Sequence, residues 1–226
     1  VHLCSRPLSP NRRCTLGRET AIQKMHWTDD GWLRLEHGGH TPAVQVPAPD
    51  LPAHPFDPEP DRDDFDAPDL SVHFQTLRIP ADESWLSLTA RPGFLRLRGG
   101  ESLSSRHHQS LVARRWQSFT FEATTCVEFA PTSFKQAAGL ICFYDVQNWF
   151  YLAMTHDEAL GRSVTVMYCD NGTYDDIGVD HGVSVGEADR VYLRVAVNHS
   201  ELAFSLSLDG SDWQTINRTY DASQLS

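Results

Sequence analysis

The sequence predicts an all-β protein: an antiparallel two-sheet sandwich of the jelly-roll type, preceded by a short β-rich N-terminal segment. From Leu70 onward the chain is a succession of short apolar or alternating runs. Turn sequences such as Arg91-Pro92-Gly93 and Asp209-Gly210 separate these runs, and none of them repeats its apolar residues at the helical period. Many short strands spaced by turns are typical of sandwiches of this kind.

Size and charge narrow the classes of protein and partner. The chain has 226 residues, which suffices for one large all-β domain plus a fragment and excludes two full enzymatic domains. The formal net charge of −11 makes a nucleic-acid partner unexpected, because phosphate binding depends on clustered Lys and Arg. The longest purely apolar run, 137–144, is too short to cross a bilayer. We therefore expect neither nucleic acid nor membrane as a partner.

Residues 1–46 read as short strands and turns. Ala21–Trp27 and Trp32–Glu36 flank the turn sequence Asp29-Asp30-Gly31, a pattern that predicts a hairpin. A lone hairpin is only marginally stable in water. Residues 1–46 are therefore expected to pack on a larger body.

Residues 47–68 are predicted to be a solvated linker. Seven prolines in this stretch block both helix and ladder hydrogen bonds and favour an extended path. The acidic residues from Asp57 onward superficially resemble a calcium loop, but Arg62 and Pro68 occupy the positions where such a loop requires Gly and Glu. The acidic residues are Asp50, Asp57, Glu59, Asp61, Asp63, Asp64 and Asp66.

Residues 69–226 are predicted to form the sandwich. Phe119–Phe129 and Val191–Val197 largely switch residue class at every second position, as strands with one buried face require. No closing strand is expected after Asp209-Gly210, so the sandwich is predicted to be truncated at its end. The expected strands are 70–74, 85–89, 94–98, 111–115, 119–129, 138–145, 149–154, 163–168, 191–197 and 202–208.

Cysteine, histidine and aromatic residues offer few candidates for chemistry. The five cysteines have irregular spacings without a CxxC pair, so we expect free thiols, with a Cys4–Cys14 bridge as the alternative. The pairs His37/His40 and His107/His108 are expected on the surface. The consecutive rings 149–151 alternate faces along a strand and either fill the core or line a sugar-stacking groove.

The N-terminal and later motifs together resemble β-xylosidases of glycoside hydrolase family 43. The string 16–23, LGRETAIQ, followed by Trp27 and Asp30-Gly31-Trp32, is similar to the last blade of the family's propeller. The segments 91–99, 111–115 and 126–144 are similar to its C-terminal concanavalin A-like sandwich. The resemblance therefore assigns 1–46 to the end of a five-bladed β-propeller and 69–226 to that sandwich.

The resemblance implies an exo-acting, inverting enzyme that releases xylose from the non-reducing ends of β-1,4-xylooligosaccharides, with α-L-arabinofuranosidase side activity in some members. Its two catalytic Asp residues and its Glu lie on earlier blades, so no catalytic residue is expected in this chain and the chain alone is expected to be inactive. Calcium is linked to the family's propeller centre, but no ligand for it is assignable here, and no cofactor or metal is expected in this chain.

Arg18 is the one substrate-binding residue that the resemblance assigns. A guanidinium holds sugar hydroxyls or a carboxylate in a fixed planar fork. The alternative is a purely structural Arg18 that joins blades through a salt bridge, with Glu19 as a candidate partner. A non-catalytic carbohydrate-binding or interface sandwich is the alternative function.

Partners and compartment follow from the same resemblance. The expected partners are a xylooligosaccharide and the remaining propeller blades of the same protein, and a homo-oligomer stays open. The family includes intracellular members, and the expected free thiols agree with this. The location is therefore expected to be cytoplasmic rather than secreted.

Overall fold

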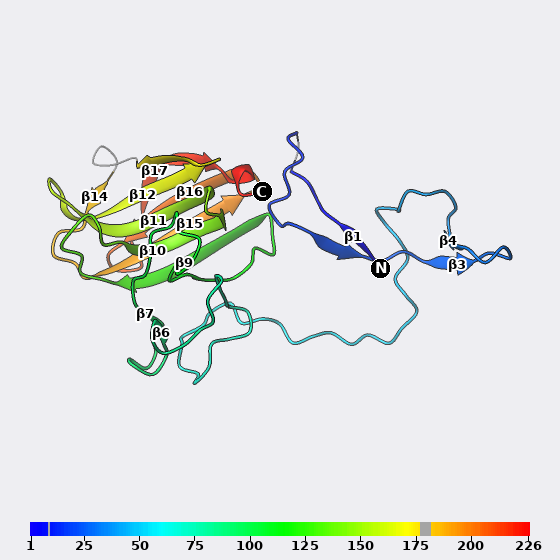
Figure 1. The fold of residues 1–226 in the computed structure, drawn as a ribbon, viewed down its shortest axis with the longest axis horizontal. Coiled ribbons are helices and arrows are strands. Elements are labelled where there is room, and N and C mark those ends of the chain that lie inside the picture. Colours follow the sequence, from blue (N-terminus) through cyan, green and yellow to red (C-terminus); the bar gives the residue numbers. More distant parts are fainter. Residues whose placement is uncertain (9, 177–181) are drawn as a thin grey trace.

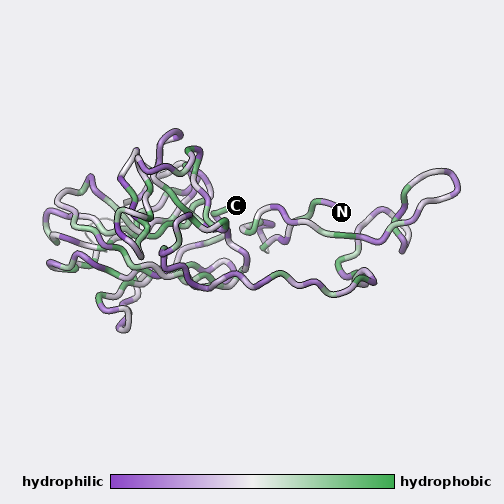
Figure 2. The backbone as a smooth tube through the Cα atoms, turned by 90° about the horizontal axis from the view of Figure 1, so that it is seen from below, coloured by the Kyte–Doolittle hydropathy of each residue, from purple (hydrophilic) through white to green (hydrophobic). Residues whose placement is uncertain are grey.

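Antiparallel strands build nearly all the regular structure of the chain, in a computed structural model that describes residues 1–8, 10–176 and 182–226. A small N-terminal unit and a two-layered sandwich are joined by a long extended segment (Figures 1 and 2). Within the described residues, no helix has the length and apolarity needed to cross a membrane. The all-β prediction is confirmed.

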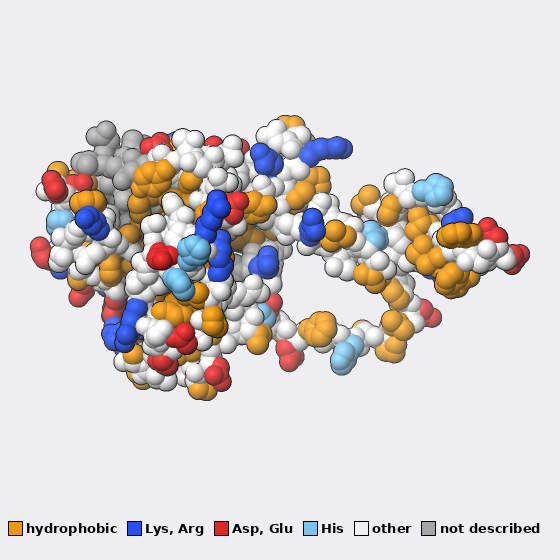
Figure 3. All heavy atoms as spheres, viewed as in Figure 1, with side chains coloured by type: hydrophobic (Ala, Val, Ile, Leu, Met, Phe, Trp, Pro, Cys, Tyr) orange, Lys and Arg blue, Asp and Glu red, His pale blue; other side chains and the backbone are white. Residues whose placement is uncertain are grey.

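The N-terminal unit consists of two small ladders. Strands β1 (His2–Cys4) and β2 (Glu19–Ala21) pair antiparallel, and β3 (Met25–Trp27) pairs with β4 (Leu33–Leu35) around the expected turn. The hairpin prediction is therefore confirmed, although the first expected strand divides between β2 and β3. Figure 3 shows hydrophobic side chains gathered on this unit. Its most exposed large apolar residues are Val1, Leu3, Trp27, Trp32 and Val44.

The segment 47–68, all of which the structure describes, contains neither helix nor strand. Its extended path is visible in Figure 1. Just past its middle, Glu59 contacts residues 70–118, which precede the first long strand of the sandwich. Glu59 accepts hydrogen bonds from Arg114 Nη2 at 2.8 Å and Gln117 Nε2 at 3.0 Å, and its Oε1 lies 3.2 Å from His73 Nδ1. The hydrogen bond from Gln117, with the neighbouring Arg114, lowers the pKa of the Glu59 carboxyl. The second half of the segment is thus attached to the sandwich through Glu59.

Two sheets form the sandwich (Figure 1). The first has the order β10-β11-β12-β13, with β14 also paired to β12. The second has the order β17-β16-β15-β9. The first-sheet strands are β10 (Ala138–Asp145), β11 (Asn148–Asp157), β12 (Gly161–Asp170), β13 (Thr173–Asp176) and β14 (Val183–Ser184). The second-sheet strands are β9 (Thr120–Glu128), β15 (Arg190–Asn198), β16 (Glu201–Ser207) and β17 (Gln214–Asp221).

The core lies between the two sheets. Alternate residues of β15 are buried, while the intervening residues are half-buried or exposed. This row packs with alternate residues of β11, β12 and β16 in one apolar cluster. Strands with one face buried require such a pattern. The cluster's largest fully buried side chains are Phe150, Leu152, Met154, Val164, Val166, Val191, Leu193, Val195, Leu202 and Phe204.

The strand β17 corrects the prediction that no closing strand follows Asp209-Gly210. It pairs with β16, with a register irregularity opposite the stretch between Ala203 and Ser205. Tyr220 of β17 lies against rings of both sheets, with centroids 5.1 Å from Phe150 and 5.9 Å from Phe204. A short 3₁₀ turn, η1 (Ala222–Gln224), follows β17 and buries Ala222 and Ser223.

The four runs expected as strands between residues 70 and 115 are shorter than predicted. The run 70–74 contains no strand, and β5 (Gln75–Thr76) follows it directly. The other three runs each contain a strand of two residues, β6 (Leu86–Ser87), β7 (Arg96–Leu97) and β8 (Val112–Ala113). The strand β5 pairs with β8, and β6 pairs with β7. Side-chain contacts attach this region to the second sheet. Glu128 of β9 forms ion pairs with both Arg91 and Arg190.

Gly139→Ala is expected to destabilise the sandwich. A Cβ at this position in β10 would lie 2.0 Å from the Leu152 carbonyl oxygen and 2.8 Å from the Ala153 Cα of β11. Both are backbone atoms, so the strands must shift, and overpacking of this kind costs about 1–3 kcal/mol. Gly99→Ala, whose Cβ would meet nothing within 4 Å, is the matched control. Urea denaturation measures both variants, and equal midpoints would contradict the close approach of β10 to β11.

Glu59→Gln is expected to lower the denaturation midpoint at neutral pH and to have no effect in acid. Because the folded pKa of Glu59 lies below its ordinary value of 4.5, its contribution to stability is present above that value and disappears as the pH falls through the lowered pKa. Glu158→Gln is the control, since Glu158 is exposed and forms no ion pair with any residue that the structure describes. A midpoint difference between wild type and Glu59→Gln that persists in acid would contradict this account.

Candidate functional site

Arg18 directly follows a tight turn and directly precedes β2. The Gly17 N–H donates to the Cys14 carbonyl at 2.7 Å, and Gly17 has φ +71°, a left-handed conformation that glycine adopts without steric cost. The Arg18 side chain is exposed. It forms no hydrogen bond or ion pair within the described part of the chain, so its guanidinium is free to receive a ligand.

Glu19 pairs with Arg6, which corrects the alternative in which Glu19 is the salt-bridge partner of Arg18. Arg6 Nε lies 3.0 Å from both carboxylate oxygens, and Arg6 Nη2 lies 2.7 Å from Oε1. These hydrogen bonds lower the pKa of the Glu19 carboxyl. Adjacent residues of an extended chain point to opposite faces, and this geometry separates Arg18 from Glu19.

Arg6 is the residue that sequence reasoning missed. The register between β1 and β2 would indicate it, because Cys4 lies opposite Glu19. Arg6 follows Cys4 by two residues, so the two-residue period of a strand places Arg6 on the same face as Cys4 and Glu19. That register becomes visible only when β1 is recognised as a strand of its own, which three residues of sequence do not reveal.

The turn between β1 and β2 contacts the end of the sandwich. The Cys14 N–H donates to Ser226 Oγ at 2.7 Å, and Arg13 Nη1 donates to the Ser226 carbonyl at 3.2 Å. Within this turn the Leu8 N–H donates to the Arg13 carbonyl at 2.6 Å, and Leu8 is buried. The strand that follows Arg18 is therefore held close to the sandwich.

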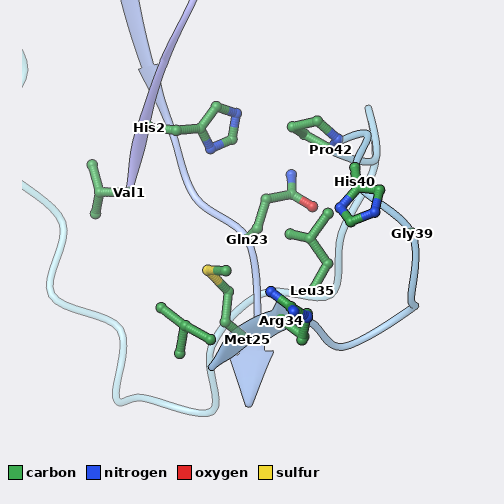
Figure 4. Close-up of a pocket in the computed structure, with 10 residues that line it drawn as sticks. Val1, His2, Gln23, Met25, Arg34, Leu35, Gly39, His40 and Pro42 are labelled. Carbon is green, nitrogen blue, oxygen red and sulfur yellow. The ribbon is translucent and has the colours of Figure 1, made fainter. Parts of the chain in front are cut away.

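Two hollows involve residues of the N-terminal unit. The first, of about 260 Å³, lies within the N-terminal unit and has no acidic residue in its lining (Figure 4). The second, of about 390 Å³, lies where Pro10 and Asn11 face the end of β17, and Asp221 is its one lining carboxylate. Glycoside hydrolysis by acid and base requires a pair of carboxyl groups, which neither lining provides. The first hollow is lined by Val1, His2, Gln23, Met25, Leu33, Arg34, Leu35, Gly39, His40 and Pro42.

The other sequence candidates lie apart from Arg18. The four histidines of the two pairs are exposed, as expected. Trp149 and Phe150 are each 1% exposed, which confirms the core interpretation of these two rings over the groove alternative. All five cysteines are free, so the Cys4–Cys14 bridge is absent.

The described residues hold no group of three or more His, Cys, Asp or Glu side chains arranged to bind a metal ion. Calcium requires six to eight oxygen ligands. The calcium that the resemblance associates with the propeller centre stays a prediction for the parent protein.

Sequence comparison defines the class of protein. Residues 62–226 match the β-xylosidase C-terminal concanavalin A-like domain of glycoside hydrolase family 43. The chain belongs to this family, and its sandwich is the concanavalin A-like domain. The family assignment made from the sequence motifs is confirmed.

Individual relatives match the whole chain, including the N-terminal unit. A β-xylosidase of Bacillus subtilis is 42% identical over 235 residues, and a xylan 1,3-β-xylosidase of a Vibrio species is 41% identical over 236 residues. The crystal structure of a xylan β-1,4-xylosidase from Bacillus halodurans is 48% identical, with a TM-score of 0.95 over the whole chain. The chain spans 43–44% of the length of these three proteins.

Proposed function

We propose that the chain is the C-terminal part of an exo-acting, inverting glycoside hydrolase that removes xylose from β-1,4-xylooligosaccharides. The observation that carries this proposal is the match of the entire chain to β-xylosidases. An arabinofuranosidase side activity is part of the proposal, because a relative named as a non-reducing-end α-L-arabinofuranosidase is 35% identical over 153 residues.

In this proposal Arg18 binds the sugar. It is exposed on the N-terminal unit, and its guanidinium is free of protein partners among the described residues. Arginine remains charged at any working pH and presents several donors in one plane. Those donors suit the hydroxyls of a pyranose or a catalytic carboxylate beside it.

The catalytic carboxyl groups belong, in this proposal, to the part of the parent protein that precedes the chain. Inversion requires an acid that protonates the leaving oxygen and a base that activates water, about 6.5–9.5 Å apart. The exposed apolar side chains of the N-terminal unit, with Trp27 at 73% and Trp32 at 62% exposure, support packing of this unit on the other propeller blades.

Arg18→Ala in the full-length protein is expected to lower kcat/KM on xylobiose by on the order of 10- to 100-fold, because it removes hydrogen bonds from a charged donor. Arg12→Ala is the matched control, because Arg12 lies with Arg18 in the connection between β1 and β2 and is also exposed. Its side chain has no partner in the described part of the chain. Steady-state kinetics give the result. Equal kcat/KM values for wild type and Arg18→Ala would contradict a sugar-binding role.

The purified chain alone is expected not to hydrolyse an aryl β-xyloside, because the acid and base are not part of it. Release of the coloured phenol measures this activity, and the full-length protein is the positive control. Turnover by the chain would contradict the proposed location of the carboxyl groups. Xylooligosaccharide binding by residues 58–226, measured by calorimetry, would favour the alternative of a carbohydrate-binding sandwich.

A further inference from the structure

One arginine connects the strand next to Arg18 with the sandwich. The Nε and Nη2 atoms of Arg6 donate hydrogen bonds to the carboxylate of Glu19 in β2, at 2.7–3.0 Å. The same guanidinium lies over the Phe119 ring of the sandwich, with Cζ 5.1 Å from the ring centroid. Phe119 in turn stacks on His199, with centroids 6.1 Å apart and ring planes at 14°. A continuous series of contacts therefore runs from the sandwich to the first residue of β2.

The hydrogen bonds between Arg6 and Glu19 hold β2 without involving the Arg18 side chain. Glu19 and Ala21 are half-buried on one face of β2, whereas Thr20 is exposed on the other. Arg18 precedes Glu19 and is exposed like Thr20. The faces of an extended chain alternate, so the sandwich holds the strand by one face and leaves the Arg18 face open.

We propose that Arg6 is a positioning residue: through Phe119 and Glu19 it couples the sandwich to the strand that carries Arg18, and so fixes where the Arg18 guanidinium meets the sugar. This inference rests on the proposed function of Arg18. Arginine suits the position because its edge donates a fork of hydrogen bonds to a carboxylate while its flat face lies on a ring. A lysine ammonium provides the charge without the fork.

The test compares Arg6→Ala, Phe119→Leu and the double variant in the full-length protein. Each single variant is expected to raise KM for xylobiose about two- to fivefold, the range of a surface cation–π contact, and to leave kcat nearly unchanged. The double variant is expected to be no worse than the single ones, because either change breaks the same series of contacts. Arg6→Lys, without the fork, is expected to resemble Arg6→Ala.

A second arginine–ring pair supplies the control. Arg194 lies over Trp213 with Cζ 3.7 Å from the ring centroid, and its Nε donates to Thr124 Oγ1 at 3.2 Å, all within the sandwich. Arg194→Ala removes an equivalent contact that does not reach β2. It is therefore expected to leave both KM and kcat unchanged.

The possible results separate this inference from the proposed function. A lowered denaturation midpoint without any change in KM for Arg6→Ala and Phe119→Leu would show a purely structural contact and overturn the inference. If Arg18→Ala lowers kcat/KM while the Arg6 and Phe119 variants leave KM unchanged, the inference fails and the proposed function stands. An unchanged kcat/KM for Arg18→Ala overturns both.

Discussion

Burial of two facing rows of aliphatic and aromatic side chains is the constraint on which the rest of the structure depends. Each sheet turns alternate residues inward, and the inner rows meet in a single cluster that includes Phe150, Leu193 and Phe204. Close packing makes such a layer resistant to deformation. The sandwich is therefore a firm support for the N-terminal unit, whose strands are only three residues long. A cation–π contact at Phe119 and hydrogen bonds at Ser226 hold the unit against it.

The N-terminal unit and the sandwich differ in how much apolar surface they bury, and this difference determines which of them positions the other. Three-residue strands with exposed tryptophans enclose too little apolar surface to define their own geometry. The backbone around Arg18 is held within the unit by the Gly17 turn and the Arg6–Glu19 pair. It is held from outside by the contacts of Arg6 with Phe119 and of Cys14 with Ser226. A residue that must meet a sugar is thus located by contacts made some distance from its own side chain.

Sequence patterns predicted the long strands well and the short or irregular elements poorly. Strands β9 to β12, β15 and β16 follow alternating or apolar runs whose period reports one buried face. The strand β17 was missed because it has only two large apolar residues, Ile216 and Tyr220, with the exposed Arg218 between them, which is too few to report a buried face. Arg18 was identified by resemblance alone, whereas Arg6 depends on a pairing between β1 and β2 that lies across a turn and leaves no local trace.

Glu59 also sets the N-terminal boundary of the part of the chain that is attached to the sandwich. The family match starts at residue 62, and composition places the boundary near residue 69, yet the carboxylate of Glu59 is the shared acceptor of Arg114 and Gln117. A fragment that starts at Pro58 retains this acceptor. A fragment that starts at Asp69 lacks Glu59, so Arg114, Gln117 and His73 lose their shared partner. For anyone excising this module, the boundary is set by a carboxylate in the proline-rich stretch and not by the first strand.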